Sequence, residues 1–73
     1  MTLDQLPLGK NGTIREVNGT ASFRRRLMEL GMLPGTTVRR TGQAPLGDPI
    51  TYLVRGAVFG LRRTEAALID LEA

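Results

Sequence analysis

The sequence predicts a mainly β protein, a small five-stranded barrel with one short α-helix packed against it. Short runs of β-branched and aromatic residues alternate with turns that contain glycine or proline, which is typical of short strands. Helical periodicity is clear in one segment, which begins near Phe23. With 73 residues, the chain has room for one core, so we expect a single domain spanning residues 1–73.

The first predicted elements are a helical turn and a strand. Thr2 and Gln5 have the spacing of a capping box, so a single turn is expected before Pro7–Gly9 ends it. Gly12–Val17 then places β-branched residues among polar ones, as in a half-buried strand. Asn18-Gly19 closes this strand, because both residues tolerate positive φ.

One amphipathic helix follows. Phe23, Leu27 and Leu30 have the i, i+4, i+7 spacing of a single helical face. Ser22 is the expected N-cap, and Gly31 stands where a helix ends in the left-handed conformation. A helix of about nine residues does not persist alone in water, so we expect its apolar face to cover the barrel.

The rest of the chain predicts four more strands joined by turns. The expected strands are Thr36–Thr41, Ile50–Val54, Ala57–Leu61 and Leu68–Leu71, and the expected connections are Gln43–Pro49, the two-residue turn Arg55-Gly56, and Arg62–Glu65. Closing these short strands into a barrel removes most of the sheet edges that so small a chain could not otherwise protect.

The charge is +3 and rests on nine arginines and one lysine. Arginine pairs with carboxylates and phosphates, so a negatively charged partner is one interpretation. A solvated surface on which the arginines balance the carboxylates is the other, and we favour it for so modest a charge. The N-terminus lacks the features of a signal peptide and no apolar run could span a bilayer, so we expect a cytoplasmic protein.

Histidine and cysteine are both absent, which removes the usual general base, the usual thiol nucleophile and the commonest transition-metal ligands. Neither GxxxxGK[ST] nor GxGxxG occurs, so nucleotide binding has no support. We therefore expect no enzymatic activity, no catalytic residue, no cofactor and no high-affinity iron site in the isolated monomer. Phe23 and Phe59 lie on predicted core faces, which leaves at most Tyr52 exposed for stacking on nucleic acid.

Three segments resemble the FeoA family, in the family's order and across nearly the whole chain. They are the helix-turn stretch FRRRLMELGMLPG at residues 23–35, the connection Ala44–Pro49, and the closing pattern Leu61-Arg62, Ala66, Ala67, Ile69 and Leu71. The resemblance implies an SH3-like barrel with one helix. It also implies an accessory protein of bacterial ferrous iron uptake that works beside FeoB, a membrane transporter with a cytosolic GTP-binding domain.

A second function stays open, that of a small RNA-binding SH3-like barrel. Gly9–Ile14 followed by Asn18-Gly19 also resembles the strand-turn pattern of ribosome-associated SH3-like domains. A steep salt dependence in a nucleic-acid binding assay would distinguish this function from protein binding.

The expected partner-binding surface is the face of the helix, and of the turn after it, that the core does not use. It comprises Arg24, Arg25, Met28, Met32 and Leu33. Methionine adapts to irregular partner surfaces, and arginine is enriched at binding hot spots. The alternative is a solvated face with partly buried methionines.

Overall fold

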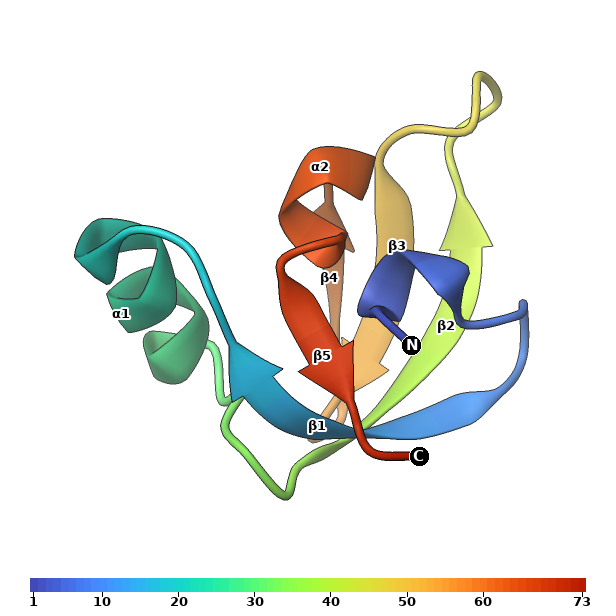
Figure 1. Ribbon diagram of the computed structural model, residues 1–73. Coiled ribbons are helices and arrows are strands. Elements are labelled where there is room, and N and C mark those ends of the chain that lie inside the picture. Colours follow the sequence, from blue (N-terminus) through green and yellow to red (C-terminus); the bar gives the residue numbers. More distant parts are fainter.

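The computed structural model describes residues 1–73 and shows a strongly bent sheet that curls into a small barrel (Figure 1). The five strands are β1 (Asn11–Val17), β2 (Thr37–Gln43), β3 (Ile50–Val54), β4 (Ala57–Leu61) and β5 (Ile69–Leu71). Neighbours pair antiparallel in the order β4-β3-β2-β1-β5. The mainly β fold with a short helix against the sheet is confirmed, with the barrel open between β4 and β5.

Three helical segments accompany the sheet: η1 (Leu3–Gln5, a 3₁₀ turn), α1 (Ala21–Glu29) and α2 (Arg63–Ala66). The capping box before η1 is confirmed, because Thr2 N–H donates to Gln5 Oε1 at 2.9 Å. No helix has both the length and the apolar character of a membrane span.

Two expectations about the helices are wrong. Ser22 is not the N-cap of α1; Thr20 is, and its Oγ1 accepts a hydrogen bond from Phe23 N–H at 3.1 Å. Arg62–Glu65 is not a simple turn, because it begins α2, whose first turn is stabilised when Glu65 Oε1 accepts from Arg62 N–H at 2.9 Å. Both helix starts could have been read from the sequence. Thr20 stands three residues before Phe23, and Glu65 stands three residues after Arg62, which is the spacing of side chains that cap a helix.

The strand boundaries follow the predictions closely. β3 and β4 have the predicted ends, and they are joined by Arg55-Gly56, whose φ angles of 50° and 82° suit a two-residue hairpin. β2 begins one residue later than expected and continues to Gln43, with an irregular register between Arg40 and Gly42. Of the two residues that β2 gains at this end, Gln43 belonged to the expected connection, which is therefore shorter.

Apolar side chains from every part of the chain fill the barrel. The buried set is Leu3, Leu6, Ile14, Leu27, Met32, Val38, Ile50, Tyr52, Val54, Leu61, Ala66, Ile69 and Leu71. Tyr52, the one aromatic for which an exposed position was left open, is buried as well, because the alternation of β3 turns it inward with Ile50 and Val54. Its hydroxyl donates to Leu3 O at 3.1 Å, which satisfies the buried polar group.

The two outer strands of the sheet, β5 and β4, differ in whether another part of the chain covers their outer edges. The edge of β5 is covered by the N-terminus, through a bridge between Thr2 and Asp70 and a hydrogen bond from Leu71 N–H to Met1 O at 2.9 Å. The outer edge of β4 pairs with no strand. The barrel therefore has one sheet edge that remains available.

Candidate functional site

Helix α1 stands at one side of the barrel, beyond the end of β1 (Figure 1). Leu27 is fully buried, while Phe23 and Leu30 are partly buried against the core, so the predicted apolar face is confirmed. Arg24, Arg25 and Met28 therefore project on the other side of the helix, away from the barrel. The residues that sequence analysis assigned to a partner surface begin here.

Four of the five predicted residues form a continuous exposed surface, which we call the docking patch: Arg24, Arg25, Met28 and Leu33. Met28 is 57% exposed and Leu33 is 36% exposed. Met32 does not belong to it, because its side chain is only 1% exposed. Gly31, with φ of 88°, reverses the chain after α1, and Met32 N–H then donates to Leu27 O at 2.9 Å, which turns the methionine into the core.

The docking patch borders two shallow hollows on either side of Met28. One, of about 200 Å³, lies between α1, β1 and the turn after α1, and is lined by Glu16, Val17, Arg24, Met28, Met32, Leu33 and Pro34. The other, of about 360 Å³, is lined by Ala21, Arg24, Arg25 and Met28. Met28 and Arg24 line both hollows, so they are central to this surface.

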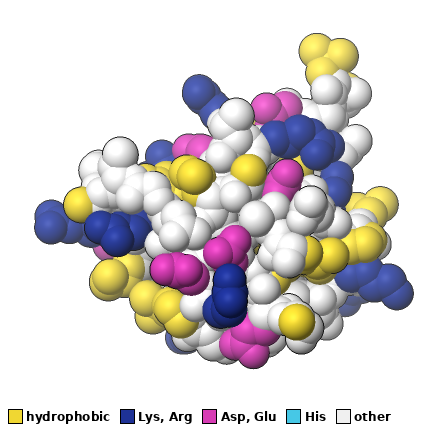
Figure 2. All heavy atoms as spheres, in the orientation of Figure 1, with side chains coloured by type: hydrophobic (Ala, Val, Ile, Leu, Met, Phe, Trp, Pro, Cys, Tyr) yellow, Lys and Arg dark blue, Asp and Glu magenta, His cyan; other side chains and the backbone are white.

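The arginines of the molecule differ in whether they form an ion pair. The ion pairs of the molecule are Arg15 with Asp70, at 3.4 Å, and Arg26 with Glu65, at 2.6 Å. Neither Arg24 nor Arg25 takes part in them. Figure 2 shows basic and apolar side chains next to each other at the α1 end of the molecule. This combination is suited to contact with a partner that is acidic and partly apolar.

The acidic side chains of the molecule do not gather into a metal site. No three side chains of histidine, cysteine, aspartate or glutamate lie together in a way that could hold a metal ion. The structure therefore provides a candidate surface for docking and no candidate metal centre.

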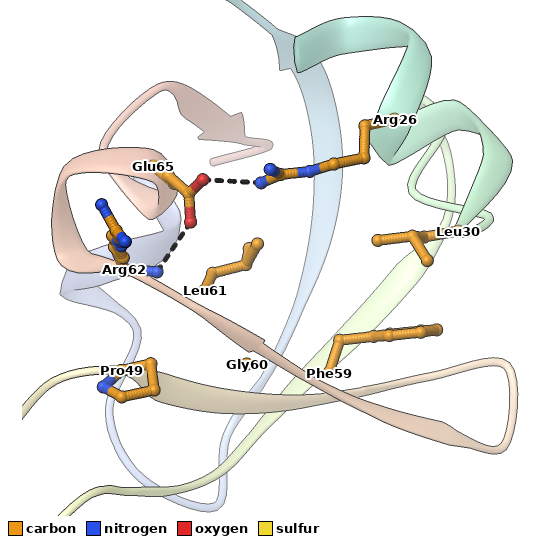
Figure 3. Close-up of a pocket in the computed structure, with 8 residues that line it drawn as sticks. All are labelled: Arg26, Leu30, Pro49, Phe59, Gly60, Leu61, Arg62 and Glu65. Atoms are coloured by element: carbon orange, nitrogen blue, oxygen red, sulfur yellow. Dashed lines mark hydrogen bonds and ion pairs between the residues drawn. The ribbon is translucent and has the colours of Figure 1, made fainter.

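Sequence analysis missed a larger hollow of about 530 Å³ on the opposite side of α1, which we call the β4 groove. It is lined by Arg26, Leu30, Pro49, Phe59, Gly60, Leu61, Arg62 and Glu65 (Figure 3). The i, i+4 spacing of Arg26 and Leu30 was a signal that these side chains share a helical face. The approach of that face to β4 and α2 depends on tertiary packing, which the sequence pattern does not specify.

Known proteins resemble this chain over its whole length. The family model described as FeoA domain matches residues 1–73. A curated protein of Porphyromonas gingivalis, described as a fusion of Fe(2+) transport protein A and the Fe(2+) transporter FeoB, is 38% identical over 72 residues. The match covers 99% of this chain and 8% of that protein, so this chain corresponds to a small part of its relative.

Solved structures agree with this match. The FeoA protein of Chlorobium tepidum has a TM-score of 0.92 and 37% identity, over 97% of this chain and 68% of that one. The zinc complex of Stenotrophomonas maltophilia FeoA, described as an SH3 domain protein, has a TM-score of 0.86 and 33% identity, over 99% of this chain and 89% of that one. The SH3-like fold is thereby confirmed, and the chain belongs to the FeoA family.

Proposed function

We propose that this chain is a cytoplasmic accessory protein of ferrous iron uptake that acts by binding a FeoB-like transporter, without catalysing a reaction itself. The P. gingivalis fusion carries the proposal, because it joins a segment similar to nearly all of this chain to FeoB in one polypeptide. The S. maltophilia relative is described as a candidate activating factor for ferrous iron transport, which agrees with a regulatory role.

We assign the contact with the transporter to the docking patch. Arg24 and Arg25 are exposed and make no ion pair, so a partner carboxylate can bind them without breaking an existing interaction. Met28 and Leu33 add exposed apolar surface beside this charge. Adaptable methionine next to arginine is a composition typical of interface hot spots.

We do not propose RNA binding as a second function. Barrels that bind single strands stack the bases on several exposed aromatic rings. Here Tyr52 is completely buried, and Phe23 and Phe59 pack against the core. The surface offers arginines but no stacking platform.

The test is a titration of the wild type and the double variant Arg24→Glu/Arg25→Glu against the cytosolic part of FeoB from the same organism. Charge reversal at an interface costs several kcal/mol, so the double variant should bind at least about tenfold more weakly. The matched control is Lys10→Glu/Arg39→Glu, which makes the same change of charge at two exposed residues outside the docking patch. Circular dichroism checks that both variants fold.

Equal affinity of the wild type and the Arg24/Arg25 variant would remove the docking patch from the proposal. The loop from Pro45 to Pro49, where Leu46 is 98% exposed, would then be the candidate contact with the transporter. A complete lack of binding by the wild type would overturn the proposed partner itself.

A further inference from the structure

The outer edge of β4 presents unpaired backbone groups. Val54 and Ala57 flank the two-residue turn and form a hydrogen-bonded pair across it. Opposite residues of an antiparallel ladder alternate between hydrogen-bonded and non-hydrogen-bonded pairs, so Val58 and Gly60 belong to non-hydrogen-bonded pairs. Val58 and Gly60 therefore direct their N–H and C=O groups away from β3. Neither residue makes a backbone hydrogen bond to a turn, a loop or a cap.

This edge forms one wall of the β4 groove, and α1 forms the opposite wall. Leu30, at the C-terminal end of α1, and Phe59 of β4 lie on facing sides in Figure 3, with Leu61 between α1 and α2. Gly60 is exposed, and Pro49 packs beside it, with its Cγ 3.6 Å from the position that a Cβ on Gly60 would take. The groove thus combines unpaired strand groups with an apolar surface, which is what an added strand requires.

The charge around the β4 groove is positive. Arg26 and Arg62 line it, and its one acidic residue, Glu65, is already paired with Arg26 at 2.6 Å. Arg55 lies just beyond Leu30, because a Cβ built on Gly31 would come within 3.1 Å of Arg55 Cδ. Arg62 and Arg55 take part in no ion pair.

We propose that the β4 groove binds an extended, acidic peptide segment of another protein, which adds to β4 as a sixth strand. Val58 and Gly60 supply the main-chain hydrogen bonds, Leu30 and Phe59 contact every second side chain, and Arg62 pairs with a carboxylate. This site is separate from the docking patch, because Arg24 and Arg26 are about 200° apart around α1. It therefore goes beyond the proposed function and does not depend on it.

The probe is a short blocked peptide of alternating valine and glutamate, titrated into the whole chain by calorimetry. One comparison peptide replaces every glutamate with glutamine, and another has the same side chains but N-methylated amides. The first tests the role of charge and the second tests strand pairing, while the protein stays unchanged.

Variants of the protein locate the site. Val58→Pro removes an edge N–H that β3 does not use, and proline is tolerated on an outer edge. We expect up to about tenfold weaker binding, as for the loss of one hydrogen bond. Val58→Thr keeps the N–H and should bind within about twofold of the wild type, as should Arg24→Gln on the far side of α1.

The proposal is supported if the glutamate peptide binds and both comparison peptides bind at least about tenfold more weakly. It is overturned if the wild type does not bind the glutamate peptide, or if the glutamine or N-methylated peptide binds equally well. Sedimentation without peptide adds a further check. A dimer that Val58→Pro abolishes would show that a second copy of this chain occupies the edge, and would also overturn the proposal.

Discussion

Arg26 on α1 and Glu65 on α2 form an ion pair of 2.6 Å between residues that are 39 positions apart in the chain. The Arg26 guanidinium also lies over the ring of Phe23, 5.4 Å from its centroid. The hydrogen bond from Arg26, followed by that from Arg62 N–H, lowers the pKa of the Glu65 carboxyl below its usual value of 4.5. The contact therefore joins α1 to the barrel in a pH-dependent way.

The lowered pKa of Glu65 predicts that acid weakens the protein. The stabilisation is fully present above pH 4.5, the pKa in the unfolded chain, and is lost as pH falls through the lower folded-state pKa. In the variant Glu65→Gln, the melting temperature should therefore decrease less between neutral pH and strong acid than it does in the wild type. Glu72→Gln, at an exposed residue, is the matched control and should leave that fall unchanged. Thermal denaturation over a pH series measures both, and parallel curves for the two variants would contradict the prediction.

The buried position of Leu27 predicts that α1 contributes to stability. Leu27→Ala removes a fully buried side chain and should lower the free energy of unfolding by about 2 to 5 kcal/mol. Met28→Ala, one residue further and largely exposed, should change it by less than about 0.5 kcal/mol. Urea denaturation of the two variants gives the comparison, and similar midpoints would mean that α1 does not cover the core.

The single tyrosine of the chain predicts a second pH effect, at the alkaline end. Burial raises the pKa of the Tyr52 phenol from 10.0 to about 12. Because the unfolded chain loses this proton first, stability should fall as pH rises from 10.0 towards about 12. Absorbance of the ionised phenol measures the titration in the folded and the urea-unfolded chain. A folded-state midpoint near 10.0 would contradict the buried position.

Tyr52→Phe tests the hydrogen bond to Leu3 separately from the packing of the ring. Leu3 O also accepts from Leu6 N–H at 3.1 Å, so it keeps one partner in the variant. The loss should therefore be only about 1 kcal/mol in the free energy of unfolding. Chemical denaturation measures it, and a loss as large as that of Leu27→Ala would indicate that η1 detaches from the barrel.

The composition of the chain predicts weak binding of ferrous iron by the purified monomer. Without histidine or cysteine, the side-chain and backbone ligands are mainly carboxylate, carbonyl and hydroxyl oxygens, which favour harder ions than iron. Anaerobic calorimetry should detect no saturable binding in the submicromolar range. A tight site of one iron per monomer would refute this expectation.

Much of the fold was predictable because local signals agreed with the tertiary structure. The hairpin at Arg55-Gly56 follows from turn chemistry, and the face of Leu27 follows from helical spacing. The position of Tyr52 was left open because the alternation of its strand was not considered. The inward alternation of β3 was nevertheless present in the sequence.

The candidate surfaces were harder to predict. Arg24, Arg25 and Met28 follow from the helical period alone, and the structure places them where that period requires. Met32 lies after the end of the helix, where the direction of a side chain depends on the turn at Gly31 and not on periodicity. The β4 groove has an unpaired strand edge because the N-terminus covers the edge of β5 and not that of β4. No local sequence pattern indicates which of the two edges is covered.

The bond between Leu71 N–H and Met1 O has a consequence for protein engineering, because it holds the two ends of the chain next to each other. A short flexible linker could join Ala73 to Met1, and new ends could be opened beside the exposed Leu46. Such a circular permutant would retain each strand pair of the sheet. It would move both attachment points for a label or a fused protein to the loop between β2 and β3, which lies on the other side of the molecule from α1 (Figure 1).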